Sequence, residues 1–308
     1  FGTNYVSGTD SQNSVGGSSV RNSNFGGSGA ATQAGIRIAA STGSIELTDT
    51  TVANMSSTGL YIDNNDGLNV SYDGRIVSDT AQTGGIVSSL VWIFTNANSD
   101  INIATGSPPA GSLITTNELS DTGGDGIKIQ NNLDTTSINL GNISLTDTVN
   151  QGILVLNDSS TTRVSSDAGL GIVRTTTPGA GIAVVDNTTT AAPDFEYFGT
   201  INNTASSSYL LSVIGENEEA TRGRIALTGP TATPFTDTGD GILLQNVEAT
   251  VSVTGASLAS TGQNAILATG GTGDFTFNDV SITGGTTAGF LKVDQTGTTT
   301  FANLSINN

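Results

Sequence analysis

Short apolar stretches recur along the chain, and most of them follow a glycine or another small residue. Gly126-Ile127-Lys128-Ile129 and Gly241-Ile242-Leu243-Leu244 are typical. Starts of this kind occur near residues 35, 59, 85, 126, 152, 181, 208, 241, 265 and 289, most of them 24 to 29 residues apart. A period of this length indicates a repeat architecture, in which each repeat is one structural unit stacked on the next.

Two apolar–polar–apolar triplets follow each of the clearest starts. In the repeat from Gly241 they are Val251-Ser252-Val253 and Ala256-Ser257-Leu258. Alternation with a period of two is the pattern of a strand that buries one face. Three short strands in each repeat predict an all-β fold, a right-handed single-stranded parallel β-helix (a β-solenoid) of about ten coils.

The repeat pattern sets the expected domain boundaries. Residues 35–308 are predicted to form the parallel β-helix. Residues 1–34 are rich in Ser, Gly and Asn and form either an irregular preceding coil or a linker. The coil is favoured, because Val20 and Phe25 resemble the third strand of a repeat. Both ends of the sequence look like parts of a repeat, so we expect the β-helix to continue in a longer parent chain. Neighbouring coils or domains of that parent are then its first partners.

Charge and missing residue types narrow the function. The 27 acidic and 9 basic residues leave a net charge of −18, which disfavours binding to nucleic acid or to anionic membranes. The chain has no Cys and no His, which excludes the usual zinc sites, cysteine nucleophiles and histidine-based triads. No apolar run reaches the length of a membrane span, so membrane insertion is not expected.

Two segments carry a resemblance to a known superfamily. The runs 121–129 (Asp-Thr-Gly-Gly-Asp-Gly-Ile-Lys-Ile) and 237–244 (Asp-Thr-Gly-Asp-Gly-Ile-Leu-Leu) resemble strand starts of right-handed parallel β-helix proteins. That superfamily includes pectate lyases, polygalacturonases, phage tailspikes and bacterial adhesin passengers. The resemblance is greatest to repeat segments of bacterial surface and adhesin passenger proteins. It implies a structural or adhesive segment of a large secreted or cell-surface protein, with a host or cell-surface protein or a glycan as partner.

The resemblance leaves a second interpretation open, a polysaccharide lyase, a glycoside hydrolase-like enzyme or a glycan-binding β-helix. Glycoside hydrolysis needs two carboxylates close together, and three pairs in the sequence qualify: Asp63 with Asp66, Asp121 with Asp125, and Asp237 with Asp240. Polygalacturonases combine their carboxylates with a Gly-His-Gly segment, which a chain without His lacks. Pectate lyases use a basic residue beside a calcium-binding carboxylate cluster, and none of the candidates Arg174, Arg222 and Arg224 has such a cluster beside it in the sequence. We therefore do not expect an enzyme.

Asp-Thr dipeptides recur after predicted third strands, with the aspartates at 49, 79, 121, 147 and 237. The first explanation is turn chemistry, in which Asp and Thr side chains bond nearby backbone N–H groups. The alternative is a calcium site, because carboxylates stacked one coil apart repel each other unless a cation lies between them. Asp121, Asp125 and Asp147 are the candidate ligands. No other cofactor is expected.

The most apolar stretch of the chain contains its single Trp. Leu90-Val91-Trp92-Ile93-Phe94 lies in the longest repeat. One interpretation places its aromatic rings in the core or under a loop. The other makes Trp92 and Phe94 a binding patch for a partner protein or glycan.

Overall fold

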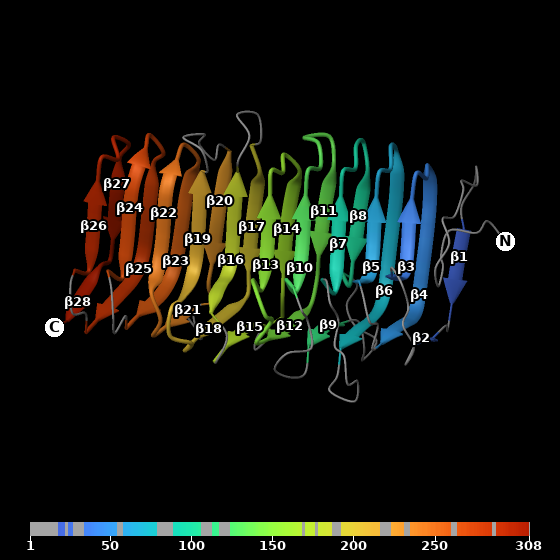
Figure 1. The fold of residues 1–308 in the computed structure, drawn as a ribbon, viewed down its shortest axis with the longest axis horizontal. Coiled ribbons are helices and arrows are strands. Elements are labelled where there is room, and N and C mark those ends of the chain that lie inside the picture. Colours follow the sequence, from blue (N-terminus) through green and yellow to red (C-terminus); the bar gives the residue numbers. More distant parts are fainter. Residues whose placement is uncertain are drawn as a thin grey trace.

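The computed structural model describes residues 18–21, 24–26, 34–53, 58–78, 89–105, 113–116, 124–167, 170–175, 178–186, 192–215, 223–230, 235–259, 264–284 and 288–307. These residues form a parallel β-solenoid without any helix, so the predicted fold class is confirmed (Figure 1). All strand pairs are parallel.

One side of the solenoid is a 10-stranded sheet, here called sheet B, to which each coil contributes one strand. Its strands are β3 (Ala34–Ala39), β5 (Thr58–Asp63), β7 (Val91–Phe94), β10 (Ile127–Gln130), β13 (Ile153–Leu156), β16 (Gly179–Asp186), β19 (Ser208–Gly215), β22 (Gly241–Val247), β24 (Ile266–Gly271) and β26 (Phe290–Val293). Eight of them pair on both sides, whereas β3 and β26 are its edges. The expected ten coils therefore include two edge coils, and about eight turns are stacked between neighbours.

The remaining strands form an 18-stranded sheet, sheet A, which bends into two rows. The longer strands β4 (Gly43–Ala53), β6 (Leu68–Ser78), β23 (Thr250–Leu258) and β25 (Phe275–Thr283) run through both rows. The other strands of the first row are β1 (Ser18–Arg21), β8 (Asp100–Ile103), β11 (Ser137–Leu140), β14 (Thr161–Ser165), β17 (Asp194–Phe198), β20 (Arg224–Thr228) and β27 (Thr299–Ala302). Those of the second row are β2 (Asn24–Gly26), β9 (Leu113–Thr116), β12 (Ile143–Thr146), β15 (Gly171–Arg174), β18 (Thr200–Asn203), β21 (Phe235–Asp237) and β28 (Ser305–Asn307).

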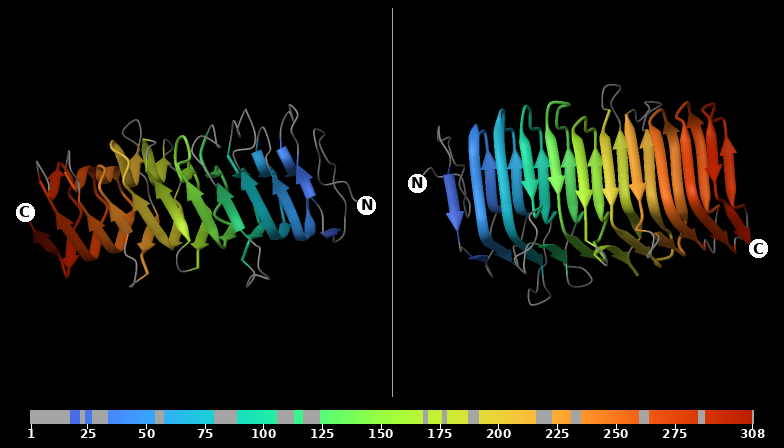
Figure 2. Two further views of the ribbon diagram at one scale, coloured as in Figure 1. Left: turned by 90° about the horizontal axis from the view of Figure 1, so that it is seen from below. Right: turned by 180° about the vertical axis from the view of Figure 1, so that it is seen from behind.

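The path of the chain has the predicted hand. In Figure 1 the strands of sheet B run upward in front, and those of the first row of sheet A run downward behind, while the chain advances from right to left. The view from behind in Figure 2 shows the same course. This winding is right-handed, as parallel crossover connections are in nearly all proteins.

Stacked apolar side chains fill the interior. In sheet B, Ile127 pairs with Ile153, and Ile129 pairs with Val155. These four side chains are at most 1% exposed. Because the same positions of successive coils face inward, the chain buries one continuous core rather than separate ones.

The third coil departs from the expected register. The start expected at Gly85 lies outside the described residues. The strand that pairs between β5 and β10 is β7, in which Val91 lies beside both Leu60 and Ile127. The long apolar run offers two strand-length candidates, and the local pattern alone does not choose between them.

Part of the predicted N-terminal segment also pairs with the solenoid. Val20 of β1 pairs with Leu47, and Phe25 of β2 pairs with Val52, both in β4. Whether residues 1–34 as a whole make a coil stays a prediction, because most of them lie outside the described residues.

Candidate functional site

Sheet B has an outer face whose side chains line up in two columns. The central column consists, in coil order, of Arg37, Tyr61, Trp92, Lys128, Leu154, Ala183, Ser212, Leu243, Leu267 and Leu291. The second column consists of Ala39, Asp63, Phe94, Gln130, Leu156, Val185, Ile214, Gln245, Thr269 and Val293. Both columns alternate with the core residues, so they project away from the interior.

Aromatic and cationic side chains occupy the N-terminal part of this face. The rings of Tyr61 and Trp92 stack with their centroids 4.9 Å apart, and Phe94 lies 5.8 Å from Trp92. Lys128 Nζ lies 4.8 Å above the Trp92 ring, and the Arg37 guanidinium lies 5.5 Å from the Tyr61 ring. The quadrupole of each ring attracts the cation above it, so the cluster is held together from both ends.

An ion pair fixes the first coil of the cluster. Arg37 Nε donates to Asp63 Oδ1 over 3.0 Å, and Arg37 Nη2 donates to Asp63 Oδ2 over 2.9 Å. This bidentate geometry orients the guanidinium toward Tyr61. Burial, followed by the charge of Asp63, raises the pKa of the Tyr61 hydroxyl to about 12. Tyr61 therefore stays neutral at physiological pH.

Trp92 and Phe94 lie on the outer face and not in the core. Both are partly buried by neighbouring coils, whereas Val91 and Ile93, which alternate with them, are fully buried inside. The interpretation that these rings fill the core is therefore wrong. Trp92 Nε1 is buried and has no hydrogen-bond partner among the described residues. The predicted role of Trp92 and Phe94 in partner binding stays a prediction.

The C-terminal part of the face is aliphatic. From Leu154 to Val293 the two columns contain eight aliphatic side chains besides Ala183: Leu154, Leu156, Val185, Ile214, Leu243, Leu267, Leu291 and Val293. Leu291 and Val293 are exposed by 37% and 42%. The sequence carried a signal for this face, because consecutive apolar residues in one strand make both of its sides apolar. In the repeat pattern these residues predict the positions of the coils, but not an apolar outer face.

Negative charge is almost absent from the two columns. Asp63 is their only carboxylate, and it is paired with Arg37, while Lys128 adds a positive charge. The chain as a whole carries 27 acidic residues. The other described carboxylates therefore lie outside these columns, some of them at the surface and others buried, as Asp147 and Asp237 are.

A polar cavity of about 450 Å³ lies on the other side of the solenoid, over sheet A. Asn102, Asn139, Arg163 and Asp167 are among its lining residues. Asn139 Nδ2 donates to Asn102 Oδ1 over 3.0 Å, and the Arg163 guanidinium lies 4.9 Å from the ring of Phe198. Amides, one cation and one carboxylate around a hollow of this size suit the hydroxyl groups of a small polar ligand.

Two of the three candidate calcium ligands, Asp125 and Asp147, are described, and both accept hydrogen bonds from other protein groups. Asp147 accepts hydrogen bonds from Thr175 N and Thr175 Oγ1 over 2.6 and 2.5 Å. Asp125 accepts one from Gln151 N over 3.1 Å. Both carboxylates interact electrostatically with Arg174, a fully buried cation whose pKa burial lowers to about 10. Asp121 lies outside the described residues. Within the described ranges no three carboxylates gather around a common point as metal ligands would, and calcium binding stays a prediction.

The candidate carboxylate pairs for glycoside hydrolysis serve structural contacts where they are described. Asp66, exposed at a turn, accepts a hydrogen bond from Asn98 Nδ2 over 2.8 Å. Asp237 is 1% exposed and accepts hydrogen bonds from Asn203 Nδ2 and Gly241 N. Burial raises the pKa of Asp237 to about 7 and also raises that of Asp240.

The two described arginines among the lyase candidates differ in exposure. Arg174 is fully buried, and Arg224 lies at the surface, where it pairs with Asp194 and Glu196. Arg222 lies outside the described residues.

The Asp-Thr turns do not form one ladder. Asp49 is exposed and lies at a bend between the two rows of sheet A, where the register of β4 shifts. Asp147 directly follows β12 and Asp237 ends β21, both in the second row, and both side chains are buried. Asp79 and Asp121 lie outside the described residues. Asp49 and Asp147 both follow an apolar–polar–apolar triplet, so the local sequence does not separate the two kinds of turn.

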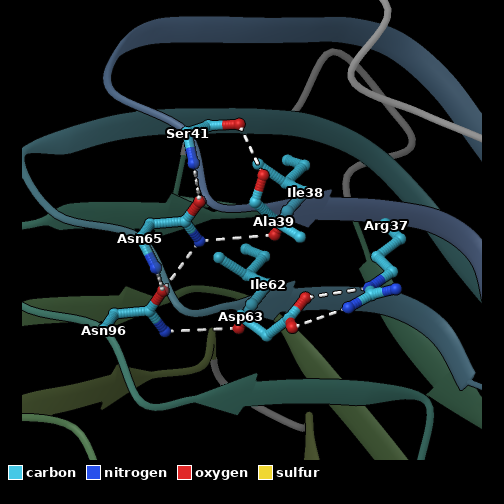
Figure 3. Close-up of polar contacts among 8 residues, drawn as sticks. All are labelled: Arg37, Ile38, Ala39, Ser41, Ile62, Asp63, Asn65 and Asn96. Carbon is cyan, nitrogen blue, oxygen red and sulfur yellow. Dashed lines mark hydrogen bonds and ion pairs between the residues drawn. The ribbon is translucent and has the colours of Figure 1, made fainter. Parts of the chain in front are cut away.

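Sequence analysis missed a ladder of buried amides at the corner between sheets B and A (Figure 3). Asn65 N and Nδ2 both donate to Asn96 Oδ1, and Asn96 N and Nδ2 both donate to Asn132 Oδ1. Asn132 N and Nδ2 donate in turn to Asp158 Oδ1, over 2.8 Å each. Each of these Asn side chains also donates to a backbone carbonyl: those of Ile38, Ile62 and Ile93. The ladder satisfies polar groups that the tight corner would otherwise leave unpaired.

Comparisons with known proteins identify no relative. No protein family, no curated protein and no solved structure matches the chain. Among the described residues, the search for an apolar helix long enough to cross a membrane found none.

Proposed function

We propose that the chain is a non-catalytic structural or adhesive segment of a large secreted or cell-surface protein, and that the outer face of sheet B is its contact surface. The observation that carries this proposal is the composition of the two columns, in which aromatic side chains at the N-terminal coils and aliphatic ones from Leu154 to Val293 outnumber the polar side chains. Contiguous apolar surface of this extent is typical of interaction sites in soluble proteins.

The rest of the fold supports a rod that holds its shape. Parallel ladders connect every coil of sheet B to the next, and the stacked interior is continuous. The amide ladder ties four successive coils at one corner. A rigid support of this kind holds the aromatic rings of Tyr61, Trp92 and Phe94 in place before a partner arrives, which lowers the entropy cost of binding.

The partners we propose follow from the chemistry of the face. Stacked rings flanked by Arg37 and Lys128 suit a host or cell-surface protein, or the apolar face of a glycan ring. The similarity of the repeat to bacterial adhesin passengers belongs to the same proposal, as does an extracellular or cell-surface location.

One observation favours a second candidate, a glycan-binding or carbohydrate-active protein. The polar cavity over sheet A offers Asn102, Asn139, Arg163 and Asp167 to a ligand, and such groups recognise sugar hydroxyls. Under this second proposal the cavity, and not sheet B, is the functional site.

A binding assay separates the two proposals. The wild-type chain, Trp92→Ser and Arg163→Ala are applied to immobilised fibronectin, collagen and laminin and to an array of mammalian and bacterial glycans. The adhesive proposal expects binding that Trp92→Ser weakens at least tenfold and Arg163→Ala leaves unchanged. Binding that depends on Arg163 alone, or cleavage of a soluble polysaccharide, would favour the second candidate instead.

A further inference from the structure

We propose that a second copy of this chain docks on the outer face of sheet B, so that two rods pair face to face. The inference rests on the proposed role of this face as a contact surface and names its occupant. Three features of the face support it: its charge, its extent, and the order of side chains along the central column.

Charge favours a second copy at this face over any other self-contact. Two chains of net charge −18 repel each other. Sheet B is the side on which the columns carry a single carboxylate, already paired with Arg37. The outer face of sheet A carries Glu46, Asp73 and Glu196 on its first row. Pairing through sheet B thus covers one carboxylate per copy, Asp63, which Arg37 already neutralises, and leaves those on sheet A in water.

The chemistry of the aliphatic half argues against an acidic partner or a polysaccharide. Between Leu154 and Val293 the columns offer no cation to a carboxylate, and few polar groups to a hydroxyl. A hydroxyl or carboxylate buried there would lose its hydrogen bonds to water without replacement. Apolar side chains match this half best, and a second copy supplies them in the rings of Tyr61 and Trp92.

The extent of the face is sufficient for a specific dimer. Ten strands about 4.8 Å apart and four residues wide cover roughly 600 Å² per copy. The two copies together bury about 1,200 Å², at the lower end of specific interfaces. Interfaces at this end of the size range are typical of weak, transient complexes, so we expect a dissociation constant on the order of micromolar.

The order of side chains selects an antiparallel pair. A two-fold axis between the Leu154 and Ala183 coils, perpendicular to the rod, places Trp92 opposite Leu243 of the second copy. The same axis places Lys128 opposite Ser212, a small and buried residue. Large side chains then meet smaller ones across the interface. A pair with parallel rods would instead bring the two Lys128 ammonium groups to the same level, where they repel.

Sedimentation velocity of the full 308-residue chain tests the proposal, at concentrations from about 1 to about 100 µM that bracket the expected constant. The test pair is Leu154→Asp with Leu243→Asp on sheet B. The matched control is Ser252→Asp with Thr276→Asp on the outer face of sheet A, which changes the net charge equally. Leu154→Thr with Leu243→Thr keeps both charge and strand propensity, in case the Asp variant fails to fold.

The expected result is a concentration-dependent dimer in the wild type and the control, and at least a tenfold weaker dimer in both sheet B variants. A monomeric wild type over the whole range overturns the inference, and so does a dimer that the sheet B variants leave intact. The proposed adhesive function can fail separately. A dimer that binds none of the matrix proteins or glycans keeps this inference and removes that function. A monomer with Trp92-dependent binding does the reverse.

Discussion

The outer faces of the two sheets differ although both belong to the same coils. The central column of sheet B contains Tyr61, Trp92 and four leucines. The equivalent outward column of the first row of sheet A contains one apolar residue, and it consists of Glu46, Ser71, Asn102, Asn139, Arg163, Glu196, Ala226, Ser252, Thr276 and Thr300. Sheet A therefore follows the pattern of a half-solvated sheet, and sheet B does not.

The interior gives no reason for this difference. Both sheets bury aliphatic side chains on their inner sides, so both meet the packing requirement of the solenoid equally well. The outward leucines of sheet B add no contact to that core. A surface that folding does not require, and that water disfavours, supports the proposed contact role, because isolated apolar surface side chains are common but extended, mainly apolar rows are not.

The largest expected effect is on the free energy of unfolding, and it distinguishes the inner side of sheet B from its outer side. Ile129 is fully buried between Ile93 and Val155. Ile129→Ala should lower the free energy of unfolding by about 2 to 5 kcal/mol, because it removes apolar contacts and leaves a cavity. Leu154→Ala, on the outer side, should cost about 1 kcal/mol or less. Guanidinium titrations at a protein concentration too low for dimers measure both. Equal costs would mean that residues of the same chain cover the outer face.

The inner side of sheet A differs from that of sheet B by a buried polar column. Arg174 pairs in register with Asn203, Asn203 with Asp237, and Asp237 with Leu258. Burial raises the pKa of Asp237 to about 7, from an ordinary value of 3.8. The folded chain therefore binds this proton more tightly than the unfolded chain. The resulting stability is complete below about pH 4 and is lost as the pH rises through 7.

The size of this pH effect is about 4 kcal/mol between pH 4 and pH 8, because each unit of difference between the two pKa values is worth about 1.4 kcal/mol. Unfolding titrations of the wild type and of Asp237→Asn over this range isolate it, because the variant has no proton to lose at that position. Parallel pH profiles for the two proteins would contradict the raised pKa.

A substitution in the amide ladder at the corner between the sheets should lower the free energy of unfolding more than a substitution on either outer face. Asn96→Ala removes the acceptor of Asn65 N and Asn65 Nδ2 and should cost about 2 kcal/mol, because buried donors lose their partners. Asn102→Ala, on the outer face of sheet A, is the matched control and should change stability by less than about 0.5 kcal/mol. Thermal melts of the two variants compare them. If Asn102→Ala destabilised the chain as much as Asn96→Ala does, the ladder would contribute no more to stability than an outer-face side chain.

The smallest expected effect is optical and concerns sheet B alone. The chain has one Trp, so its fluorescence reports only on the aromatic cluster. Dimer formation through sheet B should reduce quenching of Trp92 by acrylamide about twofold as the concentration rises through the micromolar range. Leu243→Thr, opposite Trp92 in the antiparallel pair, should abolish that change. A quenching constant independent of concentration in a dimeric wild type would place the interface elsewhere.

The repeat in the sequence predicted most of the fold, but it predicted less of the candidate site. The positions of β10, β13, β22 and β24 match the predicted starts within one residue, because a glycine and a following aliphatic pair mark each of them except β24, where Ala265 precedes the pair. The coil at β7 was misplaced, since Gly85-Ile86-Val87 carries the same mark a few residues before the strand that pairs. The amide ladder was missed because its members lie 31, 36 and 26 residues apart. Loops of unequal length hide that period in the sequence.

The sequence by itself determined the class of fold, the three strands of a coil and the exclusion of histidine and cysteine chemistry. These depend on local alternation and on residue types, and both are properties of the chain before it folds. Only the tertiary structure decided which side of each strand faces out and which residues of distant coils become neighbours. Trp92 meets Tyr61 and Lys128, 31 and 36 residues away, because the stacking of coils sets their register. The mainly apolar outer face of sheet B exists only after that stacking.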